Sequence, residues 1–153
     1  MKLKFYYPKN MQYSWLIYAF LSAFFAALVA IFGKIGLKNI DSNVATTIRA
    51  LIMAAFLIVV ILFQGKLNQI NEIFSNSKAL TFVVLSGIAG AISWLFYFLA
   101  LKRGTICQVT PIDRLSIVFA IIIALIFLGE KVTLFQSIGI VIAIAGTLMI
   151  ALG

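Results

Sequence analysis

The sequence predicts an all-α integral membrane protein with five transmembrane helices. Of its 153 residues, 64% are hydrophobic and only 10% are charged, whereas a soluble domain is about 45–50% apolar and about 25% charged. The apolar residues gather in runs of roughly twenty, the length that an α-helix needs to cross the hydrocarbon core. Helices are expected because a segment exposed to lipid must satisfy its own backbone hydrogen bonds.

We expect a basic N-terminal tail at residues 1–12, followed by one five-helix transmembrane domain at residues 13–153. The spans are placed at residues 13–32, 43–63, 79–101, 106–128 and 132–152, with a polar loop at residues 64–78. The second span is entered through Asp41, Ser42 and Asn43, which are good helix-capping residues. The connections at residues 102–104 and 129–131 are very short, so the last three spans are expected to be antiparallel neighbours.

The basic residues of the loops give only a weak signal for orientation. The net charge is +8, and most Lys and Arg residues lie between the apolar runs, as expected for topology signals and headgroup contacts rather than nucleic-acid binding. The N-terminal side holds six basic residues and the other side four, outside the spans. Met11 is an alternative start that would remove three lysines of the tail. Fixed N-in insertion and insertion in both orientations therefore both stay open.

Aromatic side chains gather at two levels of the predicted bundle. A cluster at the first boundary is typical of an interfacial belt, and it consists of Tyr6, Tyr7, Tyr13, Trp15 and Tyr18. Near the end of the third span, Trp94 and Tyr97 are three residues apart and share a helix face, so they are candidates to line a cavity. Phe96 and Phe98 are expected to face lipid.

Three side chains that are charged at neutral pH lie within the predicted spans. Arg49 is near the start of the second span and Asp113 near the start of the fourth, so both are expected roughly 9–10 Å deep from the same side. Asp113 and Arg114 are adjacent and point about 100° apart, so we predict that Asp113 pairs with Arg49. The set either fixes helix register as an ion pair or forms a substrate or anion site.

The fourth span contains Pro111, and two interpretations of it stay open. Thr110 caps a helix that starts at Pro111, which leaves residues 106–109 non-helical; alternatively the helix runs through, and Pro111 frees the carbonyl of Cys107 and kinks it. Both interpretations gather Gln108, Thr110 and Asp113 around one break. These side chains form either a cavity wall or a simple kink whose polar groups are satisfied internally.

The residue inventory argues against an enzyme. The chain has no histidine, four acidic residues and a single cysteine, Cys107. This leaves almost no material for a metal site or a hydrolytic pair of carboxylates. We therefore expect no catalytic residues, no metal and no cofactor.

Several short motifs together resemble the EamA-type domain of the drug/metabolite transporter superfamily over essentially the whole chain. They are TIRA at residues 47–50, YFLALKRG at 97–104, PIDRLS at 111–116 and LGEK at 128–131, followed by Gly139, Ile140 and Gly146. The resemblance implies a transporter of the cell (inner) membrane, with export of a small polar metabolite by alternating access. The excess of Arg49 and Arg114 over Asp113 favours an anionic group on that substrate.

Most proteins with this domain carry two inverted copies, so a chain with one copy implies an antiparallel homodimer in the lipid bilayer. The nearly balanced basic loops agree with this implication, and the small-residue ridge of Gly139, Ala143 and Thr147 is the candidate subunit face. The substrate-binding candidates are Arg49, Trp94, Tyr97, Gln108, Thr110, Asp113 and Arg114. The alternatives are a subunit of a lipid-linked sugar flippase and a non-transporting membrane assembly or regulatory partner.

Overall fold

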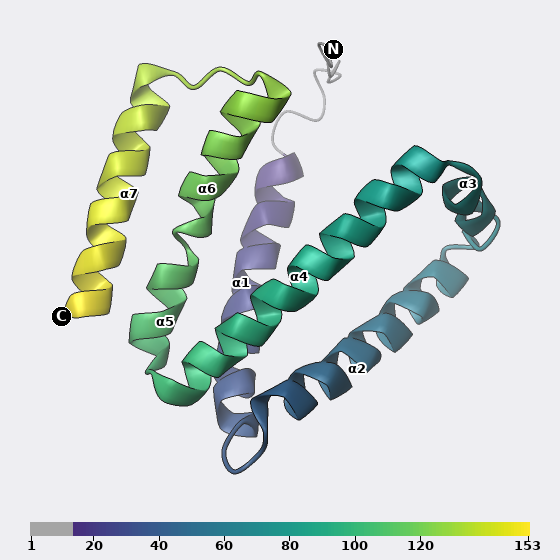
Figure 1. Cartoon of the computed structure of the whole chain (residues 1–153), viewed down its shortest axis with the longest axis horizontal. Coiled ribbons are helices and arrows are strands. Elements are labelled where there is room, and N and C mark those ends of the chain that lie inside the picture. The colour runs from purple at the N-terminus through teal and green to yellow at the C-terminus, as the bar shows by residue number, and fades with distance from the viewer. Residues whose placement is uncertain (1–13) are drawn as a thin grey trace. The chain divides into compact units, whose positions relative to one another are not determined.

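The computed structural model of the chain describes residues 14–153 and confirms the prediction of five membrane-spanning helices. These segments are α1 (Ser14–Gly36), α2 (Ser42–Phe63), α4 (Ser77–Arg103), the broken segment Ile106–Leu128 and α7 (Leu134–Leu152) (Figure 1). The predicted basic tail, residues 1–12, lies outside the described residues.

Two features of the chain differ from the predicted boundaries. The first helix continues about one turn beyond the predicted residue 32 and includes Lys34. The predicted polar loop contains a short helix, α3 (Gln69–Ser75). The broken segment consists of α5 (Ile106–Asp113), α6 (Ser116–Ile123) and the π-helical turn η2 (Ala124–Leu128).

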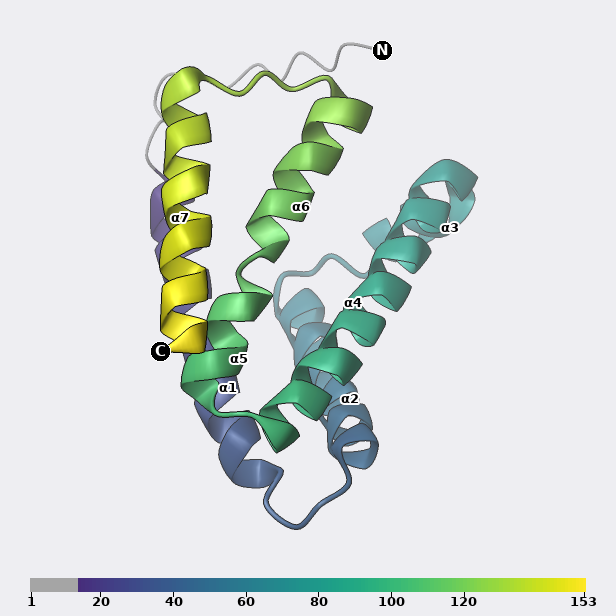
Figure 2. The ribbon, with the colours of Figure 1, turned by 60° about the vertical axis from the view of Figure 1, so that its left-hand side comes forward.

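The described chain forms two compact units. The α2–α4 unit, residues 34–103, holds the last residues of α1 together with α2, α3 and α4. The α5–α7 unit holds residues 14–33 of α1 and residues 104–153. Figure 2 shows the helical hairpin within each unit: α2 connects to α4 through α3, and η2 connects to α7 through a loop.

The α2–α4 unit is built on one face of each of its long helices. Asp41 caps α2 by accepting hydrogen bonds from the backbone N–H groups of Asn43 (2.9 Å) and Val44 (3.1 Å), which satisfies donors that a helix N-terminus leaves open. On α4, Phe98 and Leu101 are three residues apart and are 3% and 0% exposed. The two helices pack against each other, so this buried face fixes how α2 and α4 meet.

In the α5–α7 unit, α7 packs against α5. The helix begins after Thr133, whose hydroxyl accepts from the Gln136 N–H while its own backbone N–H donates to the Gln136 side chain, in a reciprocal capping box. At the other end of the loop, Gly129 closes η2 with φ 66°. Glycine adopts this left-handed conformation without the steric cost that a side chain would bring, so the chain turns sharply there.

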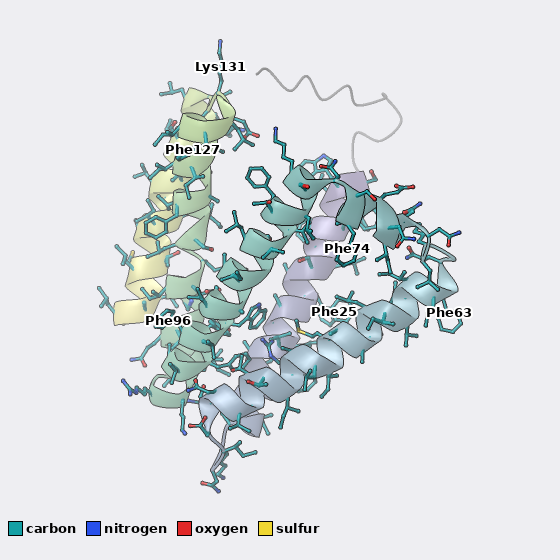
Figure 3. The ribbon with its side chains drawn as sticks, turned by 45° about the vertical axis from the view of Figure 1, so that its right-hand side comes forward. Phe25, Phe63, Phe74, Phe96, Phe127 and Lys131 are labelled. Atoms are coloured by element: carbon teal, nitrogen blue, oxygen red, sulfur yellow. The ribbon has the colours of Figure 1, made fainter. Side chains whose placement is uncertain are left out.

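The chain itself covers very little of its apolar surface. In the 18-residue apolar stretch of each span, at most 6% of the residues are buried by the rest of the chain. Phe63, Phe96 and Phe127 project from their helices and are 89%, 68% and 79% exposed (Figure 3). Apolar surface on this scale needs lipid or another protein around it.

Candidate functional site

The candidate site in the α2–α4 unit is a cation resting on aromatic rings. The guanidinium carbon of Arg49 lies 3.7 Å from the centroid of the Trp94 ring and 4.4 Å from that of Phe98. Both distances are well inside the limit of about 6 Å for a cation–π interaction. Arg49 is seven residues after the first residue of α2, which places it about 10 Å along the helix.

The aromatic rings form a compact cluster on α4. Trp94 and Phe98 are stacked, with ring centroids 5.6 Å apart and an interplanar angle of 21°. Tyr97 meets both rings edge-on, at 5.9 Å from Trp94 and 5.6 Å from Phe98. These residues are three and four positions apart, which puts them on neighbouring positions of one helix surface. The predicted shared face of Trp94 and Tyr97 is therefore present in the structure.

Arg49 keeps unused hydrogen-bond donors. Its Nε and Nη1 atoms are buried and have no hydrogen-bond partner within residues 14–153. An arginine stays charged and carries five N–H donors, and a charged group at membrane depth is costly unless it faces protein, water or a ligand. This side chain is therefore chemically suited to receive an anionic or strongly accepting group.

The expectation that Phe98 faces lipid is wrong, because its ring is buried beneath the Arg49 guanidinium. Its position, four residues after Trp94 and three before Leu101, follows the helical repeat of one face, and that spacing was the signal available in the sequence. Phe96 lies off this face and is 68% exposed, as expected for a side chain that faces lipid.

Two small polar residues on α2 were not predicted as part of the buried face. Ser42 and Thr46 are 1% and 7% exposed, and the Thr46 hydroxyl donates to the Ser42 carbonyl at 2.7 Å. The hydroxyl of Ser42 is buried without a hydrogen-bond partner in the described part of the chain. Ser42, Thr46 and Arg49 follow the spacing of one helix face, and Arg49 of this face meets Trp94 and Phe98 of α4.

The first interpretation of the fourth span is wrong, because residues 106–109 are helical and Thr110 is not the helix cap. The cap is Thr105, whose hydroxyl accepts from the Gln108 N–H (3.3 Å) while its backbone N–H donates to the Gln108 side chain (3.1 Å). Such a reciprocal capping box satisfies two open donors at once. Gln108 is therefore a capping residue at the start of α5, away from the break.

The break in this span follows Asp113, and Pro111 lies inside α5. At the break the backbone makes hydrogen bonds to the third preceding residue, among them Arg114 N to Pro111 O (3.0 Å), Leu115 N to Ile112 O (3.0 Å) and Val118 N to Leu115 O (2.9 Å). Pro111 lacks an N–H and its ring crowds the carbonyl four residues earlier, which agrees with the interpretation that the helix runs through the proline. Asp113 ends α5, and Arg114 is its C-terminal cap.

The structure thus divides the seven predicted site residues into two groups. Arg49, Trp94 and Tyr97 come together in the α2–α4 unit. The other four lie on α5 and its C-terminal cap in the α5–α7 unit, namely Gln108, Thr110, Asp113 and Arg114. The predicted ion pair between Arg49 and Asp113 would join the two units and stays a prediction.

Comparisons with known proteins agree with this helical, membrane-spanning architecture. Residues 13–152 match the EamA-like transporter family. The chain is 40% identical over 141 residues to an uncharacterized transporter in the cobO 3′ region of a Sinorhizobium species, covering 92% of this chain and 99% of that protein. It is 30% identical over 101 residues to an uncharacterized protein of Methanocaldococcus jannaschii, covering 66% of this chain and 71% of that protein. No solved structure gives a significant match.

These matches confirm the resemblance that the short motifs indicated. The family match covers nearly the whole chain, and the Sinorhizobium relative has almost the same extent. The structure agrees with them, because it has five helices that are long and apolar enough to cross a membrane. The chain belongs to the EamA-like transporter family and is a multi-pass membrane transporter.

Proposed function

We propose that this protein is a secondary transporter of the cell (inner) membrane that exports a small polar metabolite carrying an anionic group. The observation that supports this proposal best is Arg49, a cation at membrane depth that rests on Trp94 and Phe98. Its Nε and Nη1 atoms have no hydrogen-bond partner in the part of the chain that the structure describes. An anionic substrate would supply both the missing charge and the missing acceptors.

The aromatic rings beside Arg49 add a second element of recognition. A guanidinium that is held against an aromatic ring has less freedom of orientation, so less side-chain entropy is lost when it binds a carboxylate or phosphate. The ring of Tyr97 lies nearly perpendicular to the same two rings. A small metabolite with one anionic group and a compact body fits this combination of charge and apolar surface.

Asp113 is the residue that we assign to coupling. Of the four acidic residues, it alone lies in a membrane-spanning segment, because Asp41 caps α2, Glu72 lies in α3 and Glu130 follows η2. Carboxylates within membrane spans commonly serve as proton relays or ion sites. Asp113 is also the last residue of α5, next to the break in the span. Protonation or deprotonation of its side chain there would disturb few helical hydrogen bonds.

We infer that the working form is an antiparallel homodimer that alternates access between two five-helix chains. At most 6% of the residues in the apolar stretch of each span are buried by the chain itself. Ample surface is therefore available for a second copy. The weak bias of the basic loops permits insertion in both orientations. Gly139, Ala143 and Thr147, four residues apart on α7, form the small-residue ridge expected of a close helix contact.

The proposal is tested by efflux from vesicles that contain the purified protein. The vesicles are loaded with a defined mixture of amino acids, organic acids and neutral sugars, and the solutes released are measured by mass spectrometry. Solutes with an anionic group should leave fastest, and Arg49→Gln should slow their efflux about tenfold or more, because it removes a charged hydrogen-bond partner.

Arg103→Gln is the matched control, since Arg103 is an exposed arginine in the last turn of α4. Its efflux rate should equal that of the wild type. Equal rates for Arg49→Gln and the wild type would refute the role of Arg49. The absence of efflux for every solute from well-folded wild-type protein would refute transport of such metabolites.

A further inference from the structure

A hollow of about 350 Å³ lies at the end of the α2–α4 unit where α1 ends, α2 begins and α4 ends. It is lined by Lys34, Leu37, Lys38, Asn39, Leu101 and Lys102. All six residues belong to the α2–α4 unit, and none belongs to the Arg49 site. Three of the six carry a positive charge, and none of the six carries a negative one.

We propose that this hollow binds a phosphate group, presented either by the headgroup of an anionic phospholipid or by a soluble phosphate compound. It is a second site, distinct from the substrate site proposed above. Ammonium groups bind phosphate through charge-assisted hydrogen bonds, and three of them around one hollow form a concentrated positive charge. The inference rests on the charge, position and shape of this hollow alone.

The positions of two of these charges are fixed by hydrogen bonds across the unit. The Nζ atom of Lys34, near the end of α1, donates to the carbonyl of Leu101 on α4. The Nζ atom of Lys102, near the end of α4, donates to the carbonyl of Ile40 at 3.0 Å. An ammonium has three donors, so a bond to one carbonyl holds the Lys102 charge in place without using its full capacity.

Asp41, the acidic residue closest in sequence to Lys38, caps α2 and does not line the hollow. Its carboxylate accepts from the backbone N–H groups of Asn43 and Val44 at the start of α2, and it is not among the residues that line the hollow. Asp41 therefore places no carboxylate in the lining of the hollow.

A purely structural explanation accounts for part of this cluster. Lys34 lies in the last turn of α1 and Lys102 in the last turn of α4, and positive charges at helix C-termini are stabilised by the helix dipole. Lys38 lies beyond the end of α1 and still lines the same hollow. The helix dipole falls off within the last turn, so it gives no reason for the third lysine to lie here.

The apolar lining of the hollow and its position at the helix ends fit the headgroup of a phospholipid. Leu37 and Leu101, which line the hollow together with the lysines, are 4% and 0% exposed. The apolar part of the lining is therefore well packed. Asn39 turns the chain with φ 72°, a conformation that asparagine tolerates better than most residues, and its side-chain amide adds a possible donor. The hollow lies at the ends of membrane-spanning helices, the level at which basic pockets contact lipid phosphates.

Native mass spectrometry of the full-length protein in detergent tests the proposal. Phosphatidylglycerol and phosphatidylcholine are added in turn, and the affinity of each is obtained from the population of lipid adducts. We expect a preference of about tenfold or more for phosphatidylglycerol in the wild type. The triple variant Lys34→Gln, Lys38→Gln, Lys102→Gln should bring the ratio of the two affinities close to one.

The matched control is the triple variant Lys66→Gln, Lys78→Gln, Lys131→Gln, which removes the same charge from three exposed lysines that do not line the hollow. It should keep the wild-type preference. Because Lys34 and Lys102 also brace the fold, Lys38→Gln is measured alone, and it should lower phosphatidylglycerol affinity about fivefold. Equal losses in the two triple variants, or no preference in the wild type together with no binding of inorganic phosphate, would overturn the proposal.

Inorganic phosphate distinguishes the two sources of the phosphate group. The lipid titration is repeated with sodium phosphate and with sodium chloride at equal ionic strength. Phosphatidylglycerol adducts that persist in phosphate assign the hollow to a lipid headgroup. Adducts that phosphate displaces in the wild type, and that chloride does not displace, assign it to a soluble phosphate compound.

Discussion

The guanidinium carbon of Arg49 lies 3.7 Å from the centroid of the Trp94 ring, so a charged side chain of the second span rests on an aromatic side chain of the third. Tryptophan is the aromatic residue that attracts cations most strongly, and the interaction is worth about 2 kcal/mol or more when the cation is shielded from water. This contact links the packing of α2 against α4 to the chemistry of the proposed site.

Replacing Trp94 should therefore destabilise the helix pair. Trp94→Leu removes the ring beneath Arg49 and is expected to cost about 2 kcal/mol, whereas Trp94→Phe should lose only part of that. Thermal unfolding in detergent, followed by the fraction of protein that stays monodisperse, measures the difference. Phe96→Leu is the control, because Phe96 is 68% exposed, and equal losses at both positions would contradict the role of Trp94.

Arg49→Lys should separate charge from geometry. Lysine keeps the positive charge but has no planar fork and stacks poorly on Trp94 and Phe98, so we expect efflux to slow about tenfold while the protein still inserts. Vesicle efflux of anionic metabolites measures the rate, and Arg103→Lys provides the control in an exposed position. Full activity of Arg49→Lys would show that a point charge is sufficient.

Asp113→Asn should uncouple transport from protons and leave membrane insertion intact. Asparagine keeps the size of the side chain but cannot bind and release a proton at neutral pH. We expect a pH gradient to accelerate efflux through the wild type by about tenfold and to have no effect on the variant, while exchange without a gradient continues. Glu130→Gln, in the loop after η2, is the control. A variant that still responds to the gradient would exclude Asp113 as the coupling group.

Pro111→Ala should stabilise the fourth span and slow transport. Alanine restores an N–H that can bond the Cys107 carbonyl, and proline in a helix interior costs about 3 kcal/mol. Thermal unfolding and vesicle efflux are measured on the same protein, and the unfolding temperature should rise while efflux falls. A rise in stability with unchanged efflux would show that the break after Asp113 is not used in transport.

Reporter fusions test the antiparallel arrangement. Alkaline phosphatase is active only outside the cytoplasm and green fluorescent protein only inside it, so insertion in both orientations makes both C-terminal fusions active in separate cultures. Removing two basic residues with Lys38→Gln and Lys102→Gln should shift the population towards one orientation, because loop charge sets topology. Activity of only one reporter in the wild type would refute dual insertion.

Much of the architecture follows from the sequence itself. The number of spans and their ends within a few residues are dictated by the length of the apolar runs, since every backbone group in lipid must be satisfied within the helix. The cap at Asp41 also follows locally, because its carboxylate is positioned to bond the N–H groups of Asn43 and Val44. The cap at Thr105 has a similar local signal, Gln108 three residues later, but Thr110 and Pro111 in the same stretch also have the pattern of a helix start.

Only the tertiary structure decided which side chains of a span face protein. Phe96 and Phe98 are the same residue type in one apolar span, so hydrophobicity does not distinguish Phe98, which is 3% exposed, from Phe96, which is 68% exposed. The distinction comes from α2, whose Arg49 lies over Trp94 and Phe98. Likewise, the lysine-lined hollow forms only because the end of α1 lies beside the end of α4. Contacts between residues more than sixty positions apart depend on how helices pack, and no local pattern encodes them.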